Sequence, residues 1–528
     1  MPKQSPKRFT VFIPTSGVGA PIGEITKFTN KALIKVGKKP AISYIIEAYP
    51  QDTHFIVSIG YFANQVRDFL LLMYPDRDIT FVVIDPYEGE GSSLAYTMLQ
   101  SMQHLQEPFV YHASDTIVTG DIPLPDQNWI GGHKGHGSSN YASLNTNNGR
   151  VQSIHDKGAV NPDFLHIGLV GIKDHAKFWE FKQILHKENP NDQSLGDLHT
   201  LKRMIEHAVP FNLHEVKEWH DVGNVETLAK ARENIADSFH ILDKVGESIF
   251  VFDTSVVKFF HDERMATERV ARAKILEGLV PKIEGATPNF YRYSFAEGEL
   301  YADVANRSNF RGFLEWSEQN LWKPVKEVED LAFKGVCHDF YHVKSLKRIE
   351  KFLQAHSLKD AEQVINGEAV PTIKEMFERI DFDWLSSAKQ THFHGDFILD
   401  NILKTKDGFC LLDWRQNFGG LLQAGDMYYD LAKLQHNLTV NHAIVSDNLF
   451  TVRTQDDEVM CDILRKSTLV ECNQVLRDFV VEKGYDLRKV DTLTAIIWLN
   501  MSPLHHHPFD MFLFNLGKLH LWRTINEN

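Results

Sequence analysis

Short apolar runs alternate with amphipathic helical patterns from Phe9 to about Ala236. The runs have the length and alternation of strands, and the stretches between them place apolar residues at helical spacing. Strands that alternate with amphipathic helices are typical of parallel βαβ units. We therefore expect strands at 9–14, 53–61, 78–85 and 108–115, and helices at 39–49 and 63–74.

The pattern changes after a predicted helix at 225–239. Two apolar runs, 248–253 and 255–262, flank Thr254 and predict a hairpin with a tight turn. A helix at 263–279, strands at 289–298 and 300–305, and a long, mostly helical stretch follow. A small β-rich lobe followed by a large α-rich lobe is the expected layout.

The chain should form two domains, because 528 residues exceed what one hydrophobic core accommodates. We place the boundary near residues 238–246. The first predicted domain then spans 1–240 and the second 241–528, with an N-lobe over about 245–320 and a C-lobe over about 321–528.

The composition of the chain limits the classes of partner and binding site that can be expected. The net charge is −14 and the basic residues are scattered, which argues against nucleic acid or an anionic membrane as a partner. No stretch reaches the roughly 18 apolar residues of a membrane span, so we expect a soluble, cytoplasmic protein. The four cysteines lie far apart without CxxC spacing and indicate neither a zinc site nor a disulfide framework. A homo-oligomer is left open.

The segment HGDFILDN carries the first candidate chemistry. Asp396 and Asn401 share one loop, and Asp413 closes the strand-like run FCLLDW. A base for an attacking hydroxyl and two oxygen ligands for Mg²⁺ are what phosphoryl transfer from ATP requires. Asp and Asn are also ordinary turn formers, so the motif alone is weak. The order of the candidate residues along the chain strengthens the kinase interpretation, because Lys258 in a strand and Glu268 in a helix precede this loop.

Four segments in this order, VVKFF, HGDFILDN, LLDWRQNFGG and GDMYYDLAKL, resemble the aminoglycoside phosphotransferase and choline kinase family. The resemblance implies a bilobal protein-kinase-like α+β domain with a small-molecule acceptor. It implies Asp396 as catalytic base, Asn401 and Asp413 as Mg²⁺ ligands, and Lys258 as the ATP phosphate clamp paired with a helix glutamate. Glu268 is the preferred partner, with Glu263 and Glu277 as competitors. Asp426 and Asp430 are expected to hold the lobe together by hydrogen bonds.

The N-terminal half opens with a strand and a loop that contains Gly17, Gly19 and Gly23. Glycines let backbone N–H groups approach phosphates, but this spacing fits neither GxGxxG nor GxxxxGK. The ordered set is more specific. It comprises Lys31 in NKAL, VGKKPAISYII, GEGSSLAY, Asp115 after a strand, SIHDKGAV with Lys157, and WHDVGNVETLAKA with Asp221.

This set resembles the sugar-1-phosphate nucleotidyltransferases, which include cytidylyltransferases for choline phosphate. The resemblance implies a Rossmann-like, GT-A-like α/β domain with a mixed sheet. Gly17, Gly19 and the catalytic Lys31 would hold the NTP phosphates, Asp115 and Asp221 would bind Mg²⁺, and Lys157 would contact the acceptor phosphate. Asn224 better fits a helix N-cap than a ligand. An arginine that usually follows GxG is absent; Lys27 or Lys35 could compensate.

Together the two halves predict a bifunctional enzyme. It would phosphorylate a free sugar with ATP and then transfer NMP from CTP, UTP or GTP to that phosphate, giving a nucleotide-activated sugar, for example for surface or capsule polysaccharide, and pyrophosphate. One alternative is choline or another amino alcohol, for which Trp414, Tyr428, Tyr429 and Trp498 could form an aromatic cage. Another is a kinase with a non-catalytic, nucleotide-sensing N-terminal half, motivated by the absent arginine.

Three consecutive histidines, His505 to His507, suggest a metal tract. Consecutive residues cannot all face one ion on a helix or a strand. We therefore favour structural or substrate-pocket histidines over a metal site.

Overall fold

The computed structural model of the chain describes residues 8–135, 139–235, 246–455 and 458–526. Its contacts divide it into two compact units, Met1–Glu263 with Glu284–Tyr293, and Arg264–Ile283 with Ser294–Asn528. The boundary that we predicted near residues 238–246 lies, except for residue 246, outside the described residues. Each unit is described by itself, and the domain limits stay a prediction.

A nine-stranded mixed sheet forms the centre of the first unit, in the order β5-β4-β1-β6-β11-β8-β12-β10-β9. β1 pairs in parallel with β4 and β6, and β4 pairs in parallel with β5, as predicted. β11 is antiparallel to β6 and β8, which makes the sheet mixed. The strands are β1 (Thr10–Pro14), β4 (His54–Ile59), β5 (Asp78–Val83), β6 (Phe109–His112), β8 (Trp129–His133), β9 (Ser143–Asn147), β10 (Arg150–His155), β11 (Phe164–Ile172) and β12 (Asn212–Glu215).

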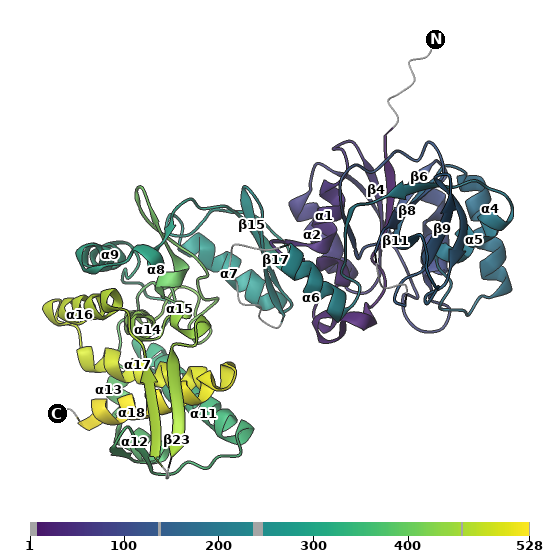
Figure 1. The fold of residues 1–528 in the computed structure, drawn as a ribbon. Helices are drawn as coiled ribbons and strands as arrows, with labels where there is room; N and C mark the ends of the chain where they lie inside the picture. Colours follow the sequence, from purple (N-terminus) through teal and green to yellow (C-terminus); the bar gives the residue numbers. More distant parts are fainter. Residues whose placement is uncertain (1–7, 136–138, 236–245, 456–457, 527–528) are drawn as a thin grey trace. The chain divides into compact units, whose positions relative to one another are not determined.

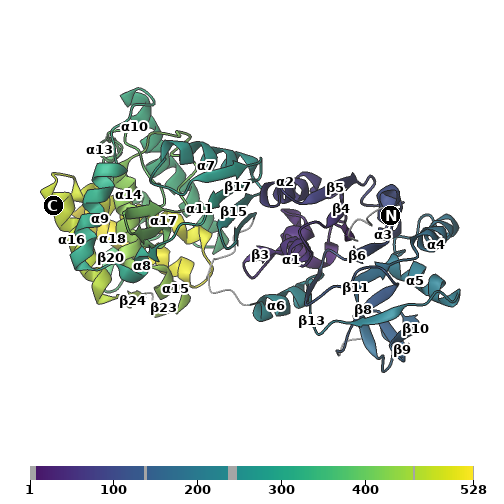
Figure 2. The ribbon, with the colours of Figure 1, turned by 90° about the horizontal axis from the view of Figure 1, so that it is seen from above.

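Helices cover both faces of this sheet because its strands are apolar on both sides. Val11 and Ile13 pack on the side of α1 (Ala41–Glu47) and α2 (Ala63–Met73). Phe12 points the other way, toward the core shared with α3 (Leu94–Ser101), α4 (His175–Glu188) and α5 (Asp197–Glu206). Figures 1 and 2 show α4 and α5 across the sheet from α1 and α2. The result is a three-layer α/β/α arrangement.

Shorter elements complete the N-terminal part and carry the candidate site. They are β2 (Lys35–Val36), β3 (Lys39–Pro40), β7 (Thr116–Thr119), β13 (Glu218–Asp221), α6 (Val225–Asn234) and the 3-10 turns η1 (Ala20–Lys27), η2 (Lys31–Leu33) and η3 (Met102–His104). The predicted helix at 225–239 is too long: α6 ends at Asn234, because Ile235 leaves helical geometry and packs against a small apolar cluster. Residues 236–239 lie outside the described part.

A separate four-stranded sheet, β14-β15-β17-β16, also belongs largely to the first unit. The predicted hairpin is present, with β14 (Glu247–Val251) antiparallel to β15 (Ser255–Phe260). β17 (Phe290–Ser294) matches the predicted strand, and β16 (Ile283–Ala286) was not predicted. The Phe69 ring on α2 lies 5.7 Å from the Phe250 ring and 5.7 Å from the Phe290 ring, so this sheet shares a core with α2.

The second unit is mainly helical, as predicted. Its helices are α7 (Glu263–Ile275), α8 (Tyr301–Val304), α9 (Arg307–Asn320), α10 (Asp330–His338), the π-helix η4 (Asp339–Val343), α11 (Lys344–Ala355), α12 (Ile373–Arg379), α13 (Phe382–Leu385), α14 (Met427–Thr439), α15 (His442–Ser446), α16 (Ser467–Glu482), α17 (Leu487–Met501) and α18 (Phe509–Asn526), with 3-10 turns η5 (Leu399–Asn401) and η6 (Ser502–Leu504). Two small sheets accompany them, β18-β21-β22 and β20-β19-β24-β23.

The strands of these sheets are short. They are β18 (Glu299–Leu300), β19 (Gln363–Ile365), β20 (Glu368–Val370), β21 (Ile402–Thr405), β22 (Gly408–Leu411), β23 (Phe450–Gln455) and β24 (Glu458–Ile463). β23 lies beside α18 (Figure 1). All four cysteines are free thiols, and Cys337, Cys461 and Cys472 are buried.

The predicted strand at 300–305 is wrong. Only Leu300 pairs, in β18, and the next four residues form the single helical turn α8. Tyr301 explains the change, because its ring packs 4.9 Å from the Phe313 ring and 5.1 Å from the Phe409 ring. Tertiary packing of one buried aromatic side chain thus overrides a short apolar alternation.

Candidate active sites

The N-terminal candidate site begins at the turn that carries Lys31. Asn30, the residue before this lysine, is fully buried. Its amide donates to the Thr15 carbonyl at 2.8 Å and the Tyr61 carbonyl at 2.6 Å, and its Oδ1 accepts from the Ala32 N–H at 2.9 Å. This residue therefore anchors the lysine turn to the end of β1.

The glycine loop packs directly on that lysine. Gly19 has φ +67, and a Cβ atom there would lie 3.0 Å from Lys31 Cβ. A side chain would be both strained and too close, so glycine is required for this approach. Gly17 has no heavy atom within 4 Å of its Cβ position, which leaves room over its backbone.

Two carboxylates face each other beside Lys31. Val222 donates its N–H to the Asp115 carbonyl at 2.9 Å, and β13 pairs antiparallel with β7. A Cβ atom at Gly223 would lie 3.0 Å from Asp221 Oδ1 and 3.2 Å from Asp115 Oδ2. Lys31 Nζ is 3.1 Å from Asp115 Oδ2. The structure thus brings together three of the N-terminal residues predicted from sequence.

Asp221 is held by its own turn and by an unpredicted tyrosine. It accepts the Gly223 N–H at 2.8 Å and the Tyr141 hydroxyl at 2.8 Å. Burial raises its pKa, the Gly223 N–H opposes that shift, and the Asp115 charge adds to it. Two such carboxylates with free oxygen lone pairs are a fitting donor set for a hard divalent cation.

Of the remaining N-terminal candidates, Lys27 and Lys157 are exposed, and Lys35 and Asn224 are half-buried. Lys157 is exposed in a turn after β10. Lys27 pairs with Glu24 at 2.7 Å, also at the surface. Asn224 caps α6 by accepting the Thr227 N–H at 3.0 Å, which confirms its predicted capping role. The geometry therefore concentrates this site on Lys31, Asp115 and Asp221.

In the second unit, a buried aspartate fixes the loop at residues 394–401, HGDFILDN, which we call the HGD loop. Asp430 on α14 accepts the backbone N–H groups of His394 and Gly395, each at 2.7 Å. It also accepts from the Trp322 indole at 3.1 Å. Asp426 accepts the Tyr341 hydroxyl at 2.6 Å. Both aspartates hold the lobe together, as predicted.

The loop places the candidate base beside its predicted metal ligand. The Asn401 amide donates to the Asp396 carbonyl at 2.9 Å and to Asp396 Oδ2 at 3.3 Å. Lys433 Nζ on α14 lies 2.7 Å from Asp396 Oδ1. Burial alone would raise the pKa of Asp396, but the Lys433 ammonium outweighs it and lowers the pKa to about 2. Asp396 is therefore ionised at neutral pH.

His394 supports this loop as a neutral ring. Burial lowers its pKa to about 4. Its Nε2 lies 2.9 Å from the Leu412 carbonyl, and its Nδ1 lies 3.3 Å from the Asp396 N–H. A carbonyl can only accept, so Nε2 carries the proton and Nδ1 accepts from the backbone.

Asp413 does not end a strand, as the sequence suggested, because β22 ends at Leu411. Asp413 instead sits in the left-handed region with φ +54, a conformation that costs a non-glycine residue free energy and is enriched at functional sites. Arg269 on α7 pairs with its Oδ1. The carboxylate is about a quarter exposed.

The predicted ATP clamp is divided between the two units. Lys258 lies in β15 of the first unit, opposite Ile249, and is 3% exposed. Glu268 lies on α7 in the second unit, where it accepts from Arg264 at 2.6 Å and also from Asn417. Its competitors Glu263 and Glu277 are both exposed, whereas Glu268 is half-buried.

Of the four aromatic residues considered for a choline cage, the two tryptophans are core, and Tyr428 and Tyr429 are half-buried. Trp414 is 1% and Trp498 is 2% exposed. The Trp414 indole donates to the Arg269 carbonyl at 2.8 Å, and the Trp498 indole bonds His436 at 2.7 Å. Neither presents a free ring face for an ammonium ligand.

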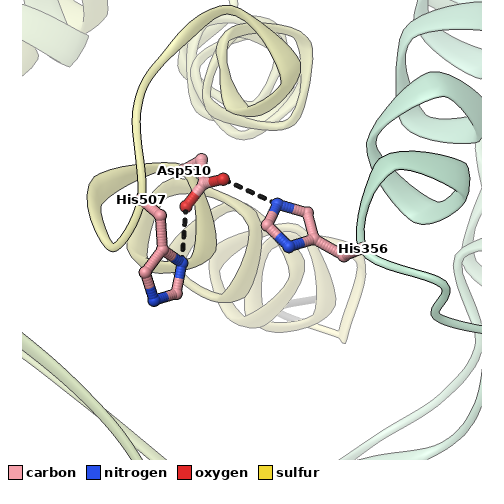
Figure 3. Close-up of side chains that lie close together, drawn as sticks. All are labelled: His356, His507 and Asp510. Carbon is pink, nitrogen blue, oxygen red and sulfur yellow. Dashed lines mark hydrogen bonds and ion pairs between the residues drawn. The ribbon is translucent and has the colours of Figure 1, made fainter.

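His505 and His507 have different neighbours, as expected for side chains in a run of consecutive residues. His507 Nδ1 lies 3.4 Å from Asp510 Oδ1, and His356 Nε2 lies 2.6 Å from Asp510 Oδ2 (Figure 3). The ligand atoms of these three residues lie within 4.8 Å of one another, a spacing that could hold a metal ion. His505 instead packs 5.0 Å from the Phe509 ring.

Sequence reasoning missed three residues of these sites: Lys433, Arg269 and Tyr141. Lys433 had a usable signal, because it follows Asp430 by three residues on one helix and so faces the same loop. Arg269 is adjacent to the predicted Glu268. Tyr141 lies in a segment without a motif.

Comparison with known proteins finds one matching family profile and several partly similar solved structures. The profile of the phosphotransferase enzyme family matches residues 338–449. No protein among the curated ones matches the chain in sequence. Within the described residues, no helix is long and apolar enough to cross a membrane.

Several solved structures are similar to part of the chain. A glucose-1-phosphate thymidylyltransferase from Bacillus anthracis is 17% identical over 44% of this chain and 98% of its own, with a TM-score of 0.38. The CTP:phosphocholine cytidylyltransferase from Streptococcus pneumoniae is 18% identical over 44% of this chain and 100% of its own, with a TM-score of 0.37. The inositol-1-phosphate CTP transferase from T. maritima is 13% identical over 43% and 98%, with a TM-score of 0.34.

Proposed function

We propose that this chain, whose residues 338–449 match the profile of the phosphotransferase enzyme family, is a bifunctional kinase and nucleotidyltransferase. The kinase site phosphorylates a small molecule, a free sugar, with ATP. The nucleotidyltransferase site then joins an NMP group to that phosphate. The observation that carries the kinase assignment is the ionised Asp396 with Asn401 at hydrogen-bond distance on a loop fixed by Asp430.

The kinase step assigns a role to each residue of that loop. The acceptor hydroxyl attacks the γ-phosphorus of ATP, the bond to the β,γ-bridging oxygen breaks, and ADP leaves. Asp396 orients the hydroxyl and receives its proton, which then passes to solvent. Asn401 and Asp413 are the oxygen donors that would hold Mg²⁺, which when bound neutralises the charge of the ATP phosphates. Lys258 is proposed to contact the ATP phosphates, with Glu268 as its helix partner.

The nucleotidyl step needs no general base. An ionised phosphate oxygen of the acceptor attacks the α-phosphorus of the NTP, the α,β bond breaks, and pyrophosphate leaves. Lys31 and the Gly17 and Gly19 backbone would hold the NTP phosphates, and Asp115 and Asp221 would hold Mg²⁺. Lys157 is proposed to reach the acceptor phosphate. The three-residue cluster at Lys31 supports this step although the arginine after GxG is absent.

The test is a product assay with the full chain. ATP, Mg²⁺ and a mixture of CTP, UTP and GTP are supplied with a panel of free sugars and amino alcohols, and product masses are recorded. We expect a sugar plus NDP mass. Asp396→Asn should lower phosphoryl transfer about 100- to 10,000-fold while ATP binding persists. Asp115→Ala should leave the phosphorylated acceptor as the end product.

Three results would contradict the proposal. Near wild-type turnover by Asp396→Asn would remove the base from its assigned role. A phosphorylated acceptor without nucleotide from the wild type would make the N-terminal half a nucleotide sensor. A choline product would replace the sugar with an amino alcohol.

A further inference from the structure

Three basic side chains gather near the candidate base. We call Lys344, Arg348 and Arg415 the cationic wall. Lys344 begins α11, and Arg348 follows one turn later on the same face. Arg415 comes from the loop after β22. Within the described part of the chain, none of the three forms an ion pair with a carboxylate.

One aromatic ring ties two of these cations together. Lys344 Nζ lies 3.7 Å and Arg415 Cζ lies 5.1 Å from the centre of the Phe340 ring. Phe340 belongs to the π-helix η4, a rare form that is frequent at functional sites. The Tyr429 ring packs 5.1 Å from the Phe340 ring, and Lys433 follows on the same helix, α14. The wall is therefore linked by direct packing to the helix that carries Lys433.

The wall also adjoins the HGD loop itself. The backbone N–H of Arg415 donates to the His394 carbonyl at 2.9 Å. A Cβ atom at Gly395 would lie 2.6 Å from Arg415 Cβ, so the arginine stem lies directly on the residue before Asp396. Lys433, at 2.7 Å from Asp396, adds a fourth cation. The carboxylates of this loop do not neutralise the wall, because Asp396 pairs with Lys433 and Asp400 lies 3.5 Å from His442.

Placing these basic groups together in a half-buried site is electrostatically unfavourable when no anion is bound between them. Burial and then the charges of Arg415, Arg348 and Lys433 lower the pKa of Lys344 to about 6. Burial and the Arg415 charge likewise lower the pKa of Arg348. Cations that destabilise one another in a half-buried site become favourable when an anion binds between them. Guanidinium groups in particular match the geometry of carboxylate and phosphate oxygens.

We propose that the acceptor of the kinase site carries an anionic group, a carboxylate or a phosphate, which the cationic wall binds while the acceptor hydroxyl lies at Asp396. This inference rests on the proposed kinase function and narrows its substrate class to acidic sugars or polyols. The same charges would repel a quaternary ammonium compound, which disfavours choline as an acceptor.

The experiment uses the full chain, ATP and acceptors matched in skeleton but not in charge. Glucose is compared with glucuronate and glucose 6-phosphate, glycerol with glycerate and glycerol 3-phosphate, and choline serves as the cation. We expect the anionic member of a pair to exceed the neutral one about tenfold or more in kcat/KM. Comparing the carboxylate acceptors with the phosphate acceptors shows which of the two anionic groups the site prefers. Preference for a neutral member or for choline would overturn the inference.

Substitutions in the cationic wall test whether its residues cause the preference for anionic acceptors. Lys344→Gln and Arg348→Gln should each raise the KM of the anionic acceptor about tenfold or more and leave the KM of ATP unchanged. Arg348→Lys, which keeps the charge, should retain more of the affinity. Lys347→Gln, an exposed lysine on the same helix, is the matched control and should change nothing. A raised KM for ATP alone would assign the wall to the nucleotide instead and overturn the inference.

Direct binding separates this inference from the kinase proposal. Glycerate and inorganic phosphate are titrated calorimetrically into the wild type and into the Lys344→Gln/Arg348→Gln double variant. Binding that only the wild type shows, without phosphoryl transfer to any acceptor, would support the anion site and refute the kinase function. Phosphorylation of neutral sugars with no effect of the variants would keep the kinase function and refute the anion site. Neither transfer nor variant-sensitive binding would refute both.

Discussion

The charge state of Asp396 is set by one neighbour. Burial of a carboxylate favours its neutral form, and the Lys433 ammonium at 2.7 Å makes the largest contribution that reverses this preference. The folded-state pKa of about 2 lies below the usual value of 3.8. The ion pair therefore stabilises the fold at neutral pH, and this contribution is lost as the pH falls from about 4 to about 2.

Removing that neighbour should make the base titrate in the working range. In Lys433→Met, burial dominates and the pKa of Asp396 rises, so phosphoryl transfer should fall on the acidic side of a kcat/KM profile between about pH 4 and 6. The wild type should show no such acidic limb from Asp396 in that range. Lys347→Met, which alters an exposed lysine, is the control. Identical profiles for Lys433→Met and the wild type would refute the coupling.

The two backbone hydrogen bonds to Asp430 predict a large stability effect. Asp430→Ala leaves the His394 and Gly395 N–H groups without their acceptor in a fully buried site. We expect a loss of about 2–4 kcal/mol in the free energy of unfolding, from two unsatisfied donors. Urea unfolding followed by circular dichroism measures it. Asp447→Ala, at an exposed aspartate, should change stability by about 0.5 kcal/mol or less.

At the scale of elements, β1, β4, β5, β6, α1 and α2 were predictable, because these four strands are apolar runs and the two helices are amphipathic. β16, β19 to β21, β23 and β24 were not, since three to six residues carry too little periodicity, whereas β22 overlaps the predicted run FCLLDW. The run at 300–305 misled because packing of Tyr301, not local preference, decides its conformation. The HGD loop was readable from spacing, but the contacts that Lys433 and Arg415 make with it are tertiary.

The HGD loop also predicts how one glycine acts. Gly395 has φ +86, and an added Cβ would lie 2.6 Å from Arg415 Cβ, an atom that cannot move without its backbone. Gly395→Ala should therefore lower kcat about tenfold or more by displacing Asp396. Gly420→Ala is the matched control, since Gly420 has φ +97 but no heavy atom within 4 Å. Equal effects of the two substitutions would attribute the loss to backbone strain alone.

At the scale of the whole molecule, the two proposed reactions are consecutive, because a phosphate monoester made by one is the nucleophile of the other. The Lys31, Asp115 and Asp221 cluster lies within the first unit, and the Asp396, Asn401 and Asp413 cluster lies within the second. Each three-residue cluster is therefore contributed by a single unit. Lys258 is the exception, since it belongs by contacts to the first unit although its proposed role is in the kinase.

This division makes a complementation experiment informative. Asp396→Asn lacks the proposed kinase base but keeps the nucleotidyltransferase cluster, and Asp115→Ala has the reverse defect. Neither variant alone should form the nucleotide-linked product from free acceptor. We expect an equimolar mixture to form it after a lag, because the phosphorylated acceptor released by Asp115→Ala is a substrate for Asp396→Asn.

The lag distinguishes a free intermediate from a retained one. Its length should shorten as both proteins are concentrated, and an added phosphatase should suppress product from the mixture more strongly than product from the wild type. Addition of chemically prepared phosphorylated acceptor should restore product with Asp396→Asn alone and not with Asp115→Ala alone. A mixture that stays inactive while that addition succeeds would mean that the intermediate leaves one chain too slowly to reach another, and the expectation of a released intermediate would be wrong.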